Sequence, residues 1–399
     1  MSAIAIALAE MGNDVSGSDL REQPVLDRVR SAGVMVNVGH EPAVVEGCDA
    51  VTASTAVPAA NVELAAARGL GIPTLSRAGM LASICAQARA VGVAGTHGKT
   101  TTTSMLMLAL VEGGLHPSFI VGGDVFDAGT GAQWTGGEWL VVEADESDGT
   151  HLELPLHASI LTNVDVDHLD HFGSFEGIVD SFDRYLTGIS GPKVVCVDDD
   201  VAAGLAAKHG AVTYGMSERA SFRAVDVRAM HGSFCFGVHH DGVALGEVAL
   251  PLRGVHNVAN ALGTIAMAVT LGVTFEQATA ALERFGGVAR RFDVRGHDGG
   301  ATFVDDYAHA FVDADVVVLT EIYSSGTTPI PGVTGKLVAD AVLDAHPMAR
   351  VVWLPRRQDM VSFLAGEVGA GDVCISMGCG DIASLPDEVL DRRLERRTA

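Results

Sequence analysis

Hydrophobic and polar positions along the first part of the chain alternate in a way that predicts an α/β protein. An apolar helix is expected over residues 3–11, and short apolar runs typical of strands follow at 15–19, 34–38 and 50–53. Helix and strand in regular succession indicate Rossmann-like organisation. Asp19 ends the first of these strands, where such folds contact a ribose hydroxyl, although a solvated turn residue is the alternative interpretation.

A second stretch predicts a parallel sheet with polar residues at its strand ends. Apolar runs at 90–94, 139–142 and 159–162 lead into Gly95, Glu143 and Asn163, and an apolar helix is expected over 104–111. Because ligands of open parallel sheets bind beyond the carboxyl ends of the strands, these three ends predict one site. A hairpin is expected from strands 234–238 and 243–248, which flank residues 239–242, and a helix over 257–270.

From about residue 289 strands are expected again, at 302–305, 315–319, 350–354 and 372–376, which indicates a third small α/β unit. The chain is long enough for several cores, and we expect three domains, 1–87, 88–288 and 289–399.

Composition narrows the class of partner. The formal net charge of -24 argues against nucleic acid or an anionic membrane as a partner, so a phosphorylated ligand needs local donors and a cation. The six cysteines show no C-x-x-C pairing, and no membrane span or signal peptide is evident. We therefore expect a cytoplasmic protein without membrane insertion; its oligomeric state does not follow from the sequence.

The run Gly95-Thr96-His97-Gly98-Lys99-Thr100-Thr101 carries the strongest chemical signal. Between a strand and a helix, its glycines allow backbone N–H groups to approach phosphate, Lys99 can reach the β- and γ-phosphates, and Thr100 can hold Mg²⁺. The pattern is not a strict Walker A, because Val93 stands where that motif has glycine. A tight glycine turn with a solvated lysine is the alternative.

Two further clusters follow the neighbouring strands. In the acidic run 143–148 we expect Glu143 to complete the Mg²⁺ coordination begun by Thr100, the alternative being a solvated loop. His168 is a candidate for a second metal ion or for contact with the transferred phosphate. The H-x-x-H spacing with His171 also suggests zinc, but no further Cys or His cluster completes a tetrahedral set, and His171 can equally be a surface histidine.

These motifs, in this order, resemble those of the Mur ligase family. The resemblance includes the phosphate loop, the acidic run 143–148, the strand end with His168 and the run 254–261. It continues through 290–292 and 305–309 to 377–381, and so covers nearly the whole chain. The family fold that it implies is α/β with three domains: a Rossmann-like N-terminal domain, a central P-loop ATPase-type parallel sheet and a small α/β C-terminal domain.

The resemblance also implies an ATP-dependent, ADP-forming amide ligase that needs Mg²⁺. Lys99 would bind phosphate, Thr100 and Glu143 would hold Mg²⁺, and His168 would serve a second Mg²⁺. The expected ligand contacts in the rest of the chain are Asn257 with adenine, Arg291 with the nucleotide phosphates, Asp305 with ribose and His309 near the amino acid. Without the family, Asn257 and Asn260 would be interpreted as polar residues at a helix start.

Within the family, the phosphate loop with its histidine, together with the run 144–148, resembles that of members that join L-alanine to UDP-N-acetylmuramate in peptidoglycan precursor synthesis. The alternatives are a recycling ligase that attaches a whole peptide to the same sugar nucleotide, and a nucleotide-binding remnant without ligase activity.

Two departures from the family pattern favour the remnant. The family opens with a strand and glycine-rich turn that this sequence lacks, so the substrate domain is expected to be incomplete; a misplaced start is one explanation. In addition, Ala310 replaces a second histidine, and residues 311–315 resemble a much later strand, as if an internal block were deleted.

Overall fold

The computed structural model describes residues 1–230, 233–289, 293–306, 314–321, 334–345, 350–378 and 380–398. The chain divides into two compact units, Met1–Val288 and Ala289–Ala399. Within the described ranges, no helix is both long and apolar enough to cross a membrane.

The N-terminal part of the first unit contains two separate pairs of parallel strands, β1–β2 and β3–β4. Its strands are β1 (Ser16–Asp19), β2 (Met35–Val38), β3 (Val51–Ala53) and β4 (Thr74–Ser76). Its helices are α1 (Ser2–Glu10), α2 (Pro24–Ser31), the short η1 (Pro42–Val45), α3 (Val62–Leu70) and α4 (Arg77–Cys85). The helix and strands expected from the sequence are confirmed to within a residue or two.

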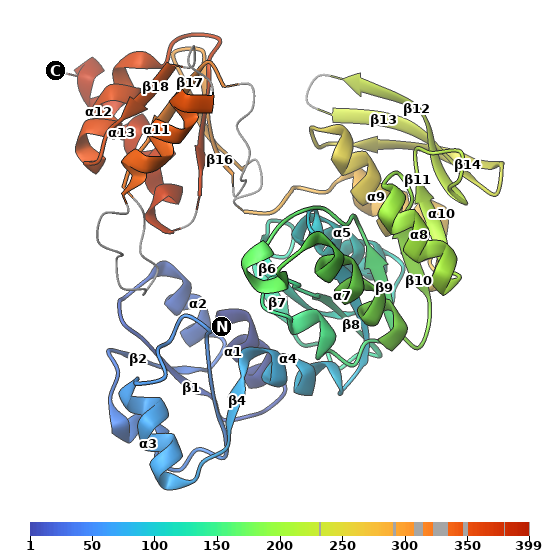
Figure 1. The fold of residues 1–399 in the computed structure, drawn as a ribbon, viewed down its shortest axis with the longest axis horizontal. Helices are drawn as coiled ribbons and strands as arrows, with labels where there is room; N and C mark the ends of the chain where they lie inside the picture. The colour runs from blue at the N-terminus through green and yellow to red at the C-terminus, as the bar shows by residue number, and fades with distance from the viewer. Residues whose placement is uncertain are drawn as a thin grey trace. The chain divides into compact units, whose positions relative to one another are not determined.

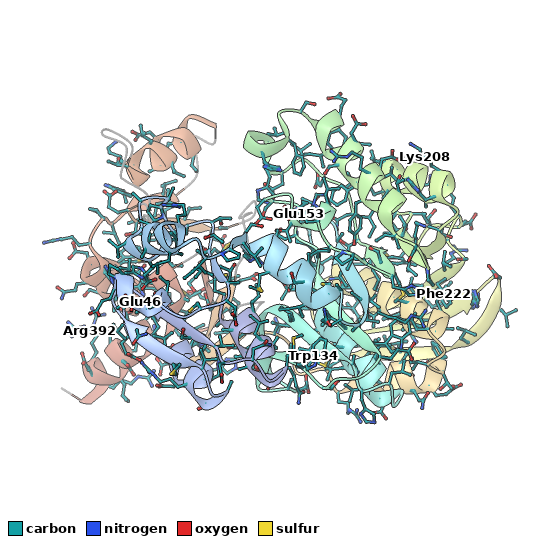
Figure 2. All side chains as sticks on the ribbon, turned by 90° about the horizontal axis from the view of Figure 1, so that it is seen from below. Glu46, Trp134, Glu153, Lys208, Phe222 and Arg392 are labelled. Atoms are coloured by element: carbon teal, nitrogen blue, oxygen red, sulfur yellow. The ribbon has the colours of Figure 1, made fainter. Side chains whose placement is uncertain are left out.

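This part is joined to the rest of its unit through α1. The backbone N–H of Trp134, labelled in Figure 2, donates to Glu10 Oε2 at 2.6 Å. Ile4, Ile6 and Ala7 of α1 are buried in the same apolar cluster as residues of the central sheet.

The centre of the first unit is a ten-stranded sheet with the order β14-β13-β12-β11-β10-β9-β5-β8-β6-β7. From β6 through β12 neighbouring strands run parallel, while β7 at one edge and β13 and β14 at the other are antiparallel. The strands are β5 (Arg89–Ala94), β6 (Ser118–Val125), β7 (Thr130–Gln133), β8 (Trp139–Glu143), β9 (Ala158–Leu161), β10 (Lys193–Cys196), β11 (Val212–Gly215), β12 (Phe222–Met230), β13 (Ser233–His240) and β14 (Val243–Leu250).

Helices cover both faces of the sheet, as buried parallel strands require. The helices of this part of the chain are α5 (Lys99–Glu112), η2 (Thr150–Leu152), α6 (Leu169–Phe172), α7 (Phe175–Gly188), α8 (Asp200–His209), α9 (Val255–Thr270) and α10 (Phe275–Glu283). Side chains of β5 alternate between two cores: Val91 and Val93 pack in the cluster of α5, α9 and α10, whereas Ala90 and Ala94 pack in that of α7 and α8. Figure 1 shows α9 and α10 beside the strands β10 to β14.

The expected hairpin is present, but its turn is shorter than the sequence indicated. His239 and His240 belong to β13, so that only Asp241 and Gly242 form the turn, with φ of 49° and 82°. Positive φ at both central positions matches the right-handed twist of the strands. The ring of His240 stacks on Phe222 of β12, which Figure 2 labels, with 3.9 Å between ring centroids.

The second unit is smaller and, within the described residues, has two sheets. One has the order β15-β16-β19 and the other is the parallel pair β17–β18. Its elements are β15 (Asp293–Asp298), β16 (Ala301–Asp306), β17 (Val316–Leu319), α11 (Gly335–Ala345), β18 (Arg350–Trp353), α12 (Arg357–Glu367), β19 (Val373–Met377), the short η3 (Gly380–Ser384) and α13 (Leu385–Thr398). The four strands expected here are confirmed.

Candidate functional site

The phosphate loop lies where the sequence places it, between β5 and α5. Gly95 and Gly98 have φ of 128° and 85°, which glycine adopts without the steric cost that other residues meet. Helix α5 begins directly at Lys99, earlier than the expected residue 104, and the hydroxyls of Thr103 and Ser104 donate to the carbonyls of Lys99 and Thr100 within its first turns. The first backbone N–H groups of α5 therefore face the loop, and Thr100 and Thr101 lie in its first turn.

The end of β9 fixes the loop from the neighbouring strand. Asn163 accepts from the backbone N–H of His97 at 2.9 Å and donates to the carbonyl of His97 at 3.0 Å, and Thr162 donates to the same carbonyl at 2.6 Å. The hydroxyl of Thr96 accepts from the N–H of Asp165 at 2.9 Å. The sequence predicted Asn163 only as the residue that ends a strand. Its side chain reaches the backbone of His97 because β5 and β9 are neighbouring strands.

Thr100 and Glu143 meet as the sequence predicted. The hydroxyl of Thr100 donates to Glu143 Oε2 at 3.2 Å, and Glu143 Oε1 accepts from the backbone N–H of Gly122 at 2.6 Å. A side chain on Gly122 would crowd this carboxylate, since its Cβ would lie 3.0 Å from Oε1. No sequence signal pointed to Gly122, because its contribution is a backbone group brought close by the pairing of β6 with β8.

The ammonium of Lys99 contacts Glu146, one of the acidic residues in the run 143–148. Lys99 Nζ donates to Glu146 Oε1 at 2.9 Å and to the carbonyls of Gly95 and Thr96 at 2.9 and 3.2 Å. Glu146 is 2% exposed, and its burial raises the pKa of the carboxyl, against the opposing effect of the Lys99 charge. The sequence alone could not show that Glu146, among the acidic residues of this run, pairs with Lys99, because the pairing depends on the path of the folded loop.

His151 links this acidic loop to helix α7. Its backbone N–H donates to the carbonyl of Asp145 at 2.9 Å, and its ring nitrogen Nε2 lies 2.9 Å from the hydroxyl of Ser181 on α7. The ring packs near Phe182 and Tyr185, with centroids 5.7 and 5.5 Å away. Burial lowers the pKa of His151 to about 4, so the imidazole is neutral at ordinary pH.

Asn260 supports the loop from α9. It is 6% exposed, and a Cβ on Gly98 would lie 2.6 Å from its Oδ1, so it packs directly against the glycine that precedes α5. Asn260 Nδ2 donates to Asn257 Oδ1 at 3.0 Å, and Asn257 Nδ2 donates to the carbonyl of Arg253 at 2.7 Å. The two asparagines thus link the first turn of α9 to the phosphate loop; a contact of Asn257 with adenine stays a prediction.

His168 lies just before α6 in an unusual backbone conformation. Its φ is 51°, in the left-handed region that only a few per cent of non-glycine residues adopt. Nε2 lies 3.7 Å from Asp167 Oδ2, and the side chain is 37% exposed. Over the part of the chain that the structure describes, no three His, Cys, Asp or Glu side chains form a group that could hold a metal ion. A second Mg²⁺ at His168 therefore stays a prediction.

The remaining expected site residues belong to the second unit. Asp305 is fully buried at the end of β16, where its Oδ1 accepts from the hydroxyl of Ser376 on β19 at 3.0 Å. Arg291 and His309 lie outside the described residues.

Two family models match the chain. The Mur ligase middle domain matches residues 93–268, and the model described as Mur ligase family, catalytic domain, matches residues 1–89.

Relatives match over nearly their full length. A UDP-N-acetylmuramate–L-alanine ligase of Acidothermus cellulolyticus is 40% identical over 447 aligned positions, which cover 100% of this chain and 93% of the relative. The enzyme of the same name from Geotalea daltonii is 36% identical, with 99% and 96% covered. Because the first alignment is longer than the 399 residues of this chain, the relative contains residues that have no counterpart here.

Solved structures agree with these relatives. The UDP-N-acetylmuramate-alanine ligase MurC of Thermotoga maritima superposes with a TM-score of 0.83 at 26% identity, covering 99% of this chain and 97% of that one. A murein peptide ligase of Psychrobacter arcticus has the same fold, with a TM-score of 0.73 at 22% identity and 98% and 96% covered. With both domain matches, full-length relatives and a phosphate loop paired to Glu143, the chain belongs to the Mur ligase family.

Proposed function

We propose that this protein is an ATP-dependent ligase that joins L-alanine to UDP-N-acetylmuramate in peptidoglycan precursor synthesis. The observation that carries the proposal is the phosphate loop, with Lys99 at the start of α5 and Thr100 hydrogen-bonded to Glu143. The relatives named for this reaction support the choice of substrates. Because the reaction consumes ATP and a nucleotide sugar, we place it in the cytoplasm.

The reaction consists of two transfers. A carboxylate is a poor acyl donor, so a lactyl carboxylate oxygen first attacks the γ-phosphorus of ATP, and ADP leaves with the electron pair of the broken P–O bond. The neutral amine of L-alanine then attacks the acyl carbon, inorganic phosphate leaves, and the amine nitrogen loses its proton. Lys99 and the N–H groups at the start of α5 would stabilise the negative charge on the transferring phosphoryl group.

The residues at the loop fit a magnesium ion. Mg²⁺ prefers hard oxygen ligands and is usually held by one or two carboxylates together with substrate phosphates. The hydroxyl of Thr100 and the carboxylate of Glu143, 3.2 Å apart, provide such oxygens at the mouth of the loop. Mg²⁺ bound there would neutralise phosphate charge.

Phosphate release by the purified chain tests the proposal. The protein is supplied with ATP, Mg²⁺ and UDP-N-acetylmuramate, with and without L-alanine, and the Lys99→Ala variant serves as the blank. We expect release that requires both substrates and disappears in the blank. Nucleotide binding without release under any condition would contradict the proposal and leave an ATP-binding remnant.

A parallel arm replaces L-alanine with a peptide amine. A murein peptide ligase shares the fold, and recycling of a peptide onto the same sugar nucleotide would give release with the peptide but not with L-alanine. Preference for L-alanine in this arm supports the proposed reaction.

A further inference from the structure

The ammonium of Lys99, which the proposed reaction requires at the phosphates, is paired with the carboxylate of Glu146 in this structure. Nζ lies 2.9 Å from Glu146 Oε1 and 2.8 Å from Oε2. Oε2 is buried, and its angle to the ammonium does not allow a hydrogen bond despite the short distance. No other donor among the described residues forms a hydrogen bond with it. Lys99 is thus the charge that compensates a buried carboxylate.

Hydrogen bonds hold the backbone of the loop that carries Glu146 in place. The backbone carbonyl of Glu146 accepts from the N–H of Gly149 at 3.0 Å, and the backbone carbonyl of Asp145 accepts from the N–H of His151. Asp148 accepts from the N–H of Thr150 at 3.1 Å and lies 3.4 Å from the guanidinium of Arg77. A lysine side chain, by contrast, is a flexible stem with a mobile charge.

We propose that nucleotide binding is coupled to proton uptake by Glu146, because the phosphates draw Lys99 away and leave this carboxylate buried without its counter-charge. The step is a protonation only: Glu146 accepts one proton from solvent and becomes a neutral carboxylic acid. The inference rests on the proposed function, since it requires a nucleotide at the phosphate loop.

The charges around Glu146 favour this outcome. Burial is the largest influence on the pKa of the Glu146 carboxyl and raises it, as does the neighbouring Asp145. The charge of Lys99, which lies on α5, lowers this pKa. Asp145 Oδ1 lies 4.0 Å from the same ammonium but is 31% exposed, so water can solvate its charge. The His151 ring beneath the loop is neutral and provides no counter-charge. Removal of a compensating charge from a buried carboxylate strongly favours its neutral form.

Isothermal titration calorimetry with ATP and Mg²⁺, without the sugar nucleotide, measures the coupling. Repeating each titration in buffers of different ionisation enthalpy gives the number of protons taken up per nucleotide bound. We expect the wild-type chain to take up more protons than Glu146→Gln at neutral pH, with a difference of at most one proton per nucleotide bound. Protons exchanged by the phosphates and Mg²⁺ are the same for both proteins and cancel in the difference.

Two control variants separate the role of Glu146 from general effects. Asp145→Asn removes a neighbouring carboxylate that is partly exposed and is the smallest of the causes that act on the Glu146 pKa, so we expect it to keep most of the proton uptake of the wild type. In Lys99→Met the counter-charge is absent from the start, so Glu146 is already neutral and the extra uptake disappears. This second variant tests the coupling even if Glu146→Gln fails to fold.

The outcomes distinguish the two proposals. If titration with ATP and Mg²⁺ gave no binding heat, the proposed function would be contradicted. Binding with the same proton number in the wild type, Glu146→Gln and Lys99→Met would overturn the coupling while leaving the proposed function intact, since Lys99 would then contact phosphate and Glu146 together.

Discussion

The hydroxyl of Thr100 and the carboxylate of Glu143 are 3.2 Å apart, although 43 positions separate them in the chain. They meet because β5 and β8 are adjacent parallel strands whose carboxyl ends share one edge of the sheet. A cation at this edge would contact a helix start and a strand end together.

Glu143→Gln keeps the shape of the side chain and an acceptor for Thr100 but removes the negative charge. We expect the apparent affinity for Mg²⁺ in phosphate release to fall by about 10- to 100-fold or more, because an amide oxygen attracts the ion less than a carboxylate does. Titration of activity with Mg²⁺ at saturating ATP measures the shift. An unchanged Mg²⁺ requirement would show that Glu143 is not a ligand.

Gly98→Ala is expected to abolish nucleotide binding. The new Cβ would lie 2.6 Å from Asn260 Oδ1, and the φ of 85° would add strain of about 1–2 kcal/mol. Gly114→Ala is the matched control beyond the other end of α5, since its φ of 74° is also positive but a Cβ there meets nothing within 4 Å. Calorimetric titration with ATP compares them. Equal loss of binding in both variants would attribute the effect to backbone strain alone.

His151 should make the fold sensitive to acid. Its pKa is lowered from 6.5 to about 4 in the folded state, so the neutral ring stabilises the fold fully above pH 6.5. That contribution is lost as the pH falls from 6.5 through 4, at about 1.4 kcal/mol per unit of pKa difference. Urea unfolding across this range should therefore show a steeper pH dependence for the wild type than for His151→Phe, which cannot take up a proton. Parallel curves would assign the acid sensitivity to other groups.

The second unit is expected to be the less stable part of the chain. Its described strands form two sheets that are not hydrogen-bonded to each other, and Val373 and Ile375 of β19 are 52% and 42% exposed. Apolar side chains that face water contribute little to folding. Restoring the internal block that the resemblance to the family leads us to expect after Ala310 should raise the midpoint of thermal unfolding of this unit. Equal midpoints with and without the block would refute the expectation.

The sequence by itself determined the class of fold and the centre of the site. Apolar runs that end in polar residues predicted β5, β8 and β9 and the edge that they share, because strand period and strand ends are local properties. The glycines, Lys99 and Thr100 of the phosphate loop were also predicted, since the conformational freedom of glycine is a local property, whereas the start of α5 at Lys99 was expected only at residue 104.

Tertiary structure alone decided which groups from distant segments support that centre. The N–H of Gly122 on Glu143, the clamp of Asn163 on His97, and the packing of Asn260 against Gly98 each need strand order or a helix crossing that no local pattern encodes. Glu146 was visible as one of several acidic residues, but only the folded loop shows that it is the buried one. Burial removes water from a carboxylate and makes its charge depend on a partner, and burial is a property of the whole fold.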